Sequence, residues 1–181
     1  MKHSTTTVLA LATLLAAAPI AAQQAGPAAE IDRGHAISFS PILALFEILQ
    51  AEYEVRLGKE TTGALGVGWW AFGDEEQNDE VSYLALDLKG RFYPDEALEG
   101  FAIGGTVGAA RIEYFDDEAE ADESTTGFAF GVELSRAWLL GDERRWFLAA
   151  GVGAKRYIFD EVDDDVPVIL PTGRLGFGLA F

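Results

Sequence analysis

The last seven residues, 175–181, read LGFGLAF and decide the fold class that this sequence predicts. Large apolar residues occupy every second position and alternate with glycine or alanine; the large ones are Leu175, Phe177, Leu179 and Phe181. A period of two residues belongs to a β-strand, because successive side chains of a strand point to opposite faces. The chain therefore ends in a predicted strand with one bulky apolar face and one small face.

The same period recurs backward through the chain as far as His35. It is clear at residues 128–135 and 146–154, where large apolar residues again alternate mostly with small ones. The pattern predicts eight strands, at residues 35–45, 47–58, 61–73, 81–94, 100–115, 125–140, 145–159 and 168–181. The fifth strand loses its phase near Ala109 and Ala110, so Arg111 and Glu113 would face the apolar side unless a bulge resets the register.

The connections between these strands alternate in character. Residues 58–60, 94–100 and 141–144 are turn-like, whereas 74–80, 116–124 and 160–167 are acidic loops. Short turns at one end and longer loops at the other are typical of an antiparallel up-and-down meander of transmembrane type. The sequence thus predicts an all-β, eight-stranded transmembrane barrel whose termini lie at the same end.

Alternation alone does not say which face is inside, and a soluble lipocalin-like barrel is the alternative. The face opposite the bulky residues is rich in glycine and alanine, which suits the crowded interior of an eight-stranded barrel. Charges on that face also balance, which predicts a network of ion pairs in the lumen. The predicted members are Glu52, Glu54, Asp87 and Glu133 with Arg56, Lys89, Arg91 and Arg174.

Aromatic residues collect near the predicted strand ends, which favours two girdles flanking an apolar band in a membrane. Those near the acidic loops are Trp69, Trp70, Phe72, Tyr114, Phe115, Tyr157 and Phe159. Those near the turns are Phe92, Tyr93, Phe101, Trp138, Trp146 and Phe181.

The N-terminus has the features of an export signal. Residues 1–22 have a short basic start, an apolar run at 8–18 and small residues before Gln23. A membrane-anchoring helix is the alternative, but the run is shorter than the roughly 20 residues that spanning requires. We therefore expect a signal peptide at 1–22, a flexible leader at 23–34 and the barrel domain at 35–181, located in the cell outer membrane.

The predicted barrel resembles the small eight-stranded bacterial outer-membrane barrels of the OmpA and OmpX type, and also the uncharacterised outer-membrane β-barrel domain families. The resemblance is carried by Ala51-Glu52-Tyr53-Glu54, by Arg91-Phe92-Tyr93-Pro94 and by the terminal GFGLAF. It implies that the alternating residues Leu175, Phe177, Leu179 and Phe181 form the membrane-insertion signal read by the barrel-assembly machinery. It also implies outer-membrane lipid and lipopolysaccharide as partners.

The charge is strongly acidic, with a net value of -17 from 13 Lys or Arg and 30 Asp or Glu. This balance argues against a nucleic-acid partner, which requires clustered basic residues. Most of the excess lies in the three acidic loops. They are interpreted as a solvated rim; the alternative is divalent-cation binding that bridges to lipopolysaccharide.

Catalytic chemistry has few candidates. There is no cysteine, and after signal removal His35 is the only histidine, so neither a thiolate site nor a histidine-based metal site is expected. His35 with Ser38 or Ser40 would be needed for a serine mechanism, and Ser38 should point to the opposite face. Glu52 and Glu54 fit an ion-pair network better than a catalytic pair.

The sequence therefore predicts no enzyme, metal or cofactor, and an integral outer-membrane barrel with a structural or surface-interaction role. A narrow channel or carrier for small apolar molecules is one alternative, and a lipid-modifying enzyme of the outer membrane is another.

Overall fold

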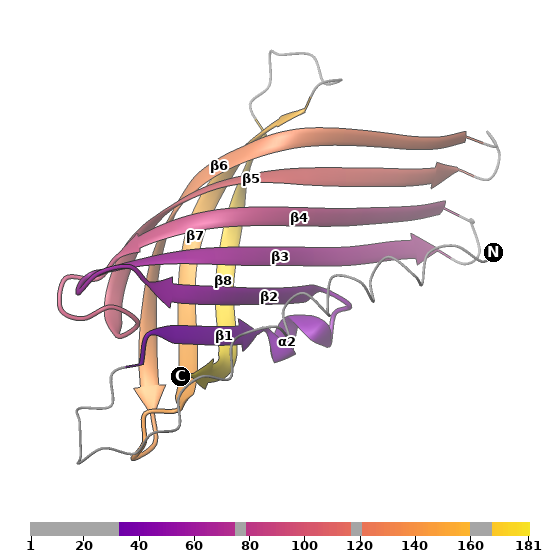
Figure 1. Cartoon of the computed structure of the whole chain (residues 1–181). Helices are drawn as coiled ribbons and strands as arrows, with labels where there is room; N and C mark the ends of the chain where they lie inside the picture. Colours follow the sequence, from indigo (N-terminus) through magenta and orange to yellow (C-terminus); the bar gives the residue numbers. More distant parts are fainter. Residues whose placement is uncertain (1–32, 75–78, 117–120, 160–167) are drawn as a thin grey trace. The chain divides into compact units, whose positions relative to one another are not determined.

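The computed structural model describes residues 33–74, 79–116, 121–159 and 168–181, which form a closed antiparallel barrel. Each strand pairs with the next along the chain, and the last pairs with the first (Figure 1). This arrangement confirms the predicted eight-stranded up-and-down barrel. The strands are β1 (His35–Phe39), β2 (Leu49–Arg56), β3 (Thr61–Asp74), β4 (Asp79–Phe92), β5 (Gly100–Asp116), β6 (Ala121–Leu140), β7 (Trp146–Phe159) and β8 (Val168–Ala180).

The strand register shows how strongly the wall is sheared. A line of paired residues starts at Ala36 and ends on β8 at Leu170, passing through Glu54, Ala64, Lys89, Thr106, Gly131 and Lys155. Ala36 itself pairs with Ala180, ten residues further along β8. For eight strands, a shear of this size corresponds to a tilt of about 40° from the barrel axis.

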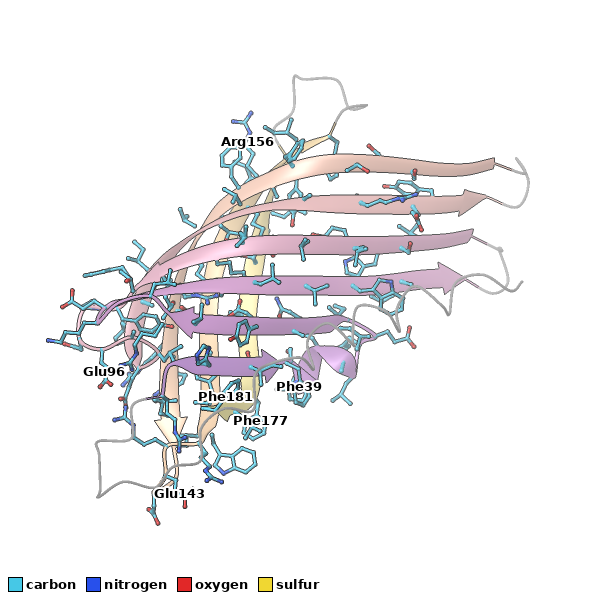
Figure 2. The ribbon with its side chains drawn as sticks, in the orientation of Figure 1. Phe39, Glu96, Glu143, Arg156, Phe177 and Phe181 are labelled. Carbon is cyan, nitrogen blue, oxygen red and sulfur yellow. The ribbon has the colours of Figure 1, made fainter. Side chains whose placement is uncertain are left out.

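The two faces of the wall differ as the alternation predicts. Small, hydroxyl and charged side chains point inward and are mostly buried. Large apolar side chains such as Leu88, Val107 and Phe128 point outward and remain exposed. Phe39, Phe177 and Phe181 lie on this outer face (Figure 2). The bulky apolar face is therefore outside the barrel and the face with small and charged side chains is inside. A soluble barrel has the reverse arrangement.

The two ends of the barrel are distinct. The turn end holds the connections 57–60, 93–99 and 141–145, together with His35 and Phe181, which exchange two backbone hydrogen bonds of 2.9 Å. The loop end receives the strands that lead into the three acidic connections. As predicted from an even number of strands, the barrel begins and ends at the same end.

Within the described residues, no helix is long and apolar enough to cross a membrane.

The prediction for residues 35–45 is wrong in its second half. β1 ends at Phe39, and residues Pro41–Ala44 form the short helix α2 instead. Proline has no N–H for a strand ladder and fits the first turn of a helix, while the residue before it is held extended. Ser40 is accordingly extended, and Pro41 starts α2.

No bulge resets the register of the fifth strand. β5 pairs without interruption with β4 and with β6, so the register is continuous past Ala109. Arg111 and Glu113 therefore do lie on the outer face, where they form an exposed ion pair of 2.8 Å. Leu84 pairs with Arg111, so on β4 and β5 the apolar outer face gives way to polar residues near that level.

Candidate functional site

The middle of the barrel interior holds a layer of buried ion pairs. Glu52 lies 2.6 Å from Lys89, 2.9 Å from Arg91 and 2.7 Å from Arg174. Glu133 accepts a hydrogen bond of 2.6 Å from Arg91. These side chains come from β2, β4, β6 and β8, so the ionic layer ties opposite walls together across the lumen.

Glu54 is the most completely satisfied carboxylate of this ionic layer. One oxygen accepts hydrogen bonds from Thr62 (2.6 Å) and from the Tyr93 hydroxyl (2.8 Å). The other accepts from Arg174 at 2.6 Å and lies 3.0 Å from Arg91. A buried charge is tolerated when its lone pairs are bonded in this way, and removal of a single partner becomes costly.

A second ion pair lies nearer the loop end. Lys155 on β7 approaches Asp87 on β4 to 2.5 Å, and both are largely buried. Asp87 was predicted for the network, but Lys155 was missed. The alternation along β7 could have found it, because Lys155 continues the inward face of Gly151 and Gly153.

The structure brings together Glu52, Glu54, Lys89, Arg91, Glu133 and Arg174 and places Asp87 beside them. Arg56 lies apart. It is at the turn end, where it pairs with Glu96 at 3.3 Å and donates to the carbonyl of Ala97 at 3.2 Å. The balance of four acids and four bases is kept because Lys155, rather than Arg56, supplies the fourth base.

Below the ionic layer, the turn end is packed with apolar side chains. This lower core consists of Ala36, Tyr93, Leu98, Ala102, Ala137, Phe147, Ala149 and Ala180. Leu98 belongs to the connection between β4 and β5 and is fully buried, although its φ of 71° is a left-handed conformation that leucine rarely adopts. Ala97 donates to the carbonyl of Lys59 at 2.9 Å. The connection is thereby held against the barrel and closes its turn end.

Above the ionic layer, inward-facing aromatic residues line the interior, and we call this region the upper chamber. The chamber residues are Trp70, Phe72, Tyr83, Tyr157 and Phe159, and the buried alanines Ala85, Ala110 and Ala129 pack with them. Trp70 stacks on Tyr83, and the hydroxyls of Tyr83 and Tyr157 are 3.0 Å apart. Phe72 is half exposed, so this half is less tightly filled than the lower core.

The upper chamber corrects part of the predicted aromatic girdles. Trp70, Phe72, Tyr157 and Phe159 line the interior, Tyr114 lies on the same inward-facing side of β5, and Tyr93 is buried in the lower core. The reason is the phase of each strand: of two neighbouring residues such as Trp69 and Trp70, only one faces outward. The outer girdle at the turn end retains Phe92, Phe101, Trp138, Trp146 and Phe181.

The predicted insertion residues lie together on the outer face of β8. Leu175, Phe177, Leu179 and Phe181 point outward; Phe177 stacks on Trp146, and Phe181 stacks on His35 at 5.6 Å. His35 is hydrogen-bonded to the Tyr53 hydroxyl at 2.7 Å. The recognition of these residues by an assembly machinery stays a prediction.

Two arginines lie on the apolar outer face over aromatic rings. Arg136 is 4.8 Å from the ring centre of Phe101 and 5.3 Å from that of Trp138. Arg156, labelled in Figure 2, lies 6.0 Å from Phe130. Long side chains at such positions can lie along an apolar surface while their charged ends extend away from it.

Three predictions concern residues outside the described part of the chain. They are the signal peptide at 1–22, most of the leader at 23–34, and the cation-binding alternative for the side chains of the acidic loops.

Comparisons with known proteins concern the fold. No family model and no curated protein matches the chain. Among solved structures, the chain is similar to the N-terminal β-barrel domain of OprF from Pseudomonas aeruginosa, with 15% sequence identity. The match covers 81% of this chain and 94% of that chain, with a TM-score of 0.45. The barrel assignment rests on the strand register of this chain itself.

Proposed function

We propose that this protein is an integral barrel of the bacterial outer membrane with a structural role. The observation that carries the proposal is the orientation of the wall. Large side chains such as Leu88, Ile103 and Val152 are more than half exposed on the outer face, and charged residues fill the interior. In water this surface would be an extensive apolar patch, whereas in lipid it becomes the anchoring band.

The backbone supports the same location. Lipid offers no hydrogen bonds, so a spanning β-structure must pair its strands in a closed ring. The eight strands pair around the whole wall at the level of β1. The apolar outer face is bounded toward the loop end by Arg111 and Glu113, and at the turn end by the outer aromatic residues. Lipid and lipopolysaccharide are the partners that such a band would contact.

A structural role is supported over a conducting channel by how the interior is filled. Arg91 bridges Glu52, Glu54 and Glu133, and below it Leu98 and Phe147 are fully buried. An ion would have to break this ionic layer and displace the lower core. We expect purified protein to give no steady conductance in planar bilayers.

The lipid-modifying enzyme has weaker support. His35 is bound to Tyr53 and stacked between Tyr53 and Phe181, and Ser38 points inward to a different face. The His35 and Ser38 side chains therefore do not form a serine-type pair. Cells that express the His35→Ala variant should have the same lipid A mass spectrum as cells expressing the parent protein.

The membrane location is tested by heat-modifiable migration. The protein is expressed with its signal, membranes are separated by density, and the outer-membrane fraction is run on gels with and without boiling. We expect a compact band that shifts on boiling. Recovery of the folded protein in the soluble periplasmic fraction would overturn the proposal.

A further inference from the structure

The barrel wall is complete at the turn end and broken toward the loop end. β1 has 5 residues and β2 has 8, whereas β3 has 14 and β8 has 13 (Figure 1). β1 pairs with β8 only as far as Phe177, and β2 pairs with β3 only as far as Trp69. Among the described residues, the facing edges of β8 (168–176) and β3 (70–74) have no strand partner. We call this break the notch.

The sequence of β8 is adapted to an open edge. Phe181 uses its N–H and its carbonyl to bond His35 on β1, so the backbone groups of every second residue before it face the same edge. Pro171 is one of them, and proline has no N–H. It therefore removes one donor from an edge that would otherwise need a partner, and proline within sheets is typical of such edges.

The base of the notch is incompletely packed. A small cavity of about 10 Å³ lies there, lined from the interior by Ser38, Glu52 and Arg174 and from the outer face by Phe39 and Leu175. Ser40 also lines it, is 2% exposed, and has no hydrogen-bond partner for its hydroxyl within the described part of the chain. A buried hydroxyl without a partner is uncommon, so the base of the notch is less completely satisfied than the ionic layer.

The surroundings of the notch are apolar. The segment from Pro41 to Phe46 contains no polar side chain, and Leu45 within it is 80% exposed. On β8, Ile169 is well exposed on the outer face near the loop end. In the membrane location proposed above, the notch therefore opens at the level of lipid acyl chains rather than water.

The upper chamber lies directly behind the notch. Trp70 begins the unpaired edge of β3 and points inward, and Leu170 on the open edge of β8 points inward and is 48% exposed. Phe72 is 50% exposed on the same inner surface. These apolar side chains are exposed toward the lumen, which provides a binding surface above the floor formed by the ionic layer.

We propose that the upper chamber binds an acyl chain of a bilayer lipid, which enters sideways through the notch. The acyl chain and the upper chamber match chemically, because aromatic and aliphatic side chains line the chamber and lipid hydrocarbon lies outside the notch. The floor formed by Asp87, Lys155 and the ionic layer stops the chain from passing further. This inference rests on the proposed membrane location and adds a ligand class to it.

Trp69 and Trp70 provide the test, because they are adjacent and face opposite sides of β3. Two variants each retain one of them, with the other tryptophans replaced by phenylalanine. A third carries Phe147→Trp as its only tryptophan, in the lower core. Each is refolded into phosphatidylcholine vesicles whose chains are brominated near the middle, and fluorescence quenching is compared with unbrominated vesicles. Heat-modifiable migration establishes that each variant is folded.

The three quenching values separate the outcomes. We expect strong quenching of Trp69. A tryptophan at position 147 should be quenched little, because the barrel wall separates it from the brominated chains. Trp70 should be quenched at least half as strongly as Trp69. Quenching of Trp70 no stronger than at position 147 overturns the acyl-chain inference and leaves the membrane location intact. A Trp69 that is not quenched in a folded barrel contradicts the membrane location itself.

A pair of neighbouring substitutions tests the route. Leu170→Phe adds volume inside the chamber beside the notch, and Ile169→Phe adds the same kind of volume on the outer face. We expect Leu170→Phe to lower Trp70 quenching by about twofold or more, because packed side chains exclude other molecules. Ile169→Phe should leave it unchanged. Equal quenching of Trp70 in the two variants would contradict entry through the notch.

Discussion

The lower core and the upper chamber are built on the same strands and differ in how they are closed. At the turn end, Phe147 and Leu98 are fully buried, and all eight strands are paired around the ring. Toward the loop end, β1 and β2 have ended, and inward residues such as Phe72 and Leu170 remain half exposed. The ionic layer separates the two regions. The turn end therefore supplies stability, while the upper half keeps apolar side chains exposed toward the lumen.

Arg91 in the separating ionic layer should give the largest effect. Arg91→Met removes the partner that Glu52, Glu54 and Glu133 share, and three buried carboxylates then depend on Lys89 and Arg174. The free energy of unfolding should fall by about 5 kcal/mol, because an uncompensated buried charge is costly. Urea unfolding in vesicles or micelles measures the change.

The control for Arg91 is Arg111, whose ion pair with Glu113 is exposed on the outer face. Arg111→Met should cost about 1 kcal/mol or less. Similar losses in both variants would show that the ionic layer is not the structural junction between the two halves.

Phe147 and Phe159 compare the two regions directly, since both lie on β7 and point inward. Phe147→Ala leaves a cavity in the lower core and should lower the free energy of unfolding by about 4 kcal/mol. Phe159→Ala should cost about 1 kcal/mol, because a partly exposed ring in the upper chamber loses less burial. Equal losses measured by urea unfolding would contradict the contrast between the two regions.

The sequence predicts the barrel and the inward position of its charged residues, but not how those residues pair. Alternation was enough for the barrel and for the inward position of Glu52, Glu133 and Arg174. The pairing of charges was not, because partners such as Arg174 and Glu54 are 120 residues apart in sequence and meet inside the barrel from β8 and β2, on either side of β1. Their contact depends on the shear of the whole wall, which no local pattern contains.

The sequence pattern contains only one indication of the notch, an interruption of the first predicted strand. Pro41 interrupts the first predicted strand, but the residues after it are apolar as in a strand, so hydrophobicity alone does not show that the strand ends before it. The aromatic residues at strand ends were assigned to girdles by position. Tracing the phase of each strand would have placed Trp70 and Tyr157 inside, since their neighbours two residues away face inward.

The orientation of the wall itself is tested by Leu88, halfway along the outer apolar run of β4. Leu88→Arg places a charge against the middle of the membrane and should lower the free energy of unfolding by about 3 kcal/mol. Leu140→Arg, at the turn end of β6, should cost about 1 kcal/mol or less, because charge is tolerated near the interface. If unfolding in vesicles shows no dependence on depth, the outer band does not face lipid.

The smallest effect on stability is expected at the seam where the lower ring closes. Phe181 is partly exposed and stacks on His35, while its backbone makes the two closing hydrogen bonds. Phe181→Ala keeps those bonds, so the free energy of unfolding of the refolded protein should fall by only about 1 kcal/mol.

If Phe181 is also part of an insertion signal, the amount of heat-modifiable protein in cells should fall severalfold. Phe92→Ala is the matched control, because it removes an outward ring of similar exposure at the turn end that lies outside the predicted insertion signal. Equal yields of the two variants in cells would assign Phe181 a packing role alone, and a selective loss at Phe181 would separate assembly from stability.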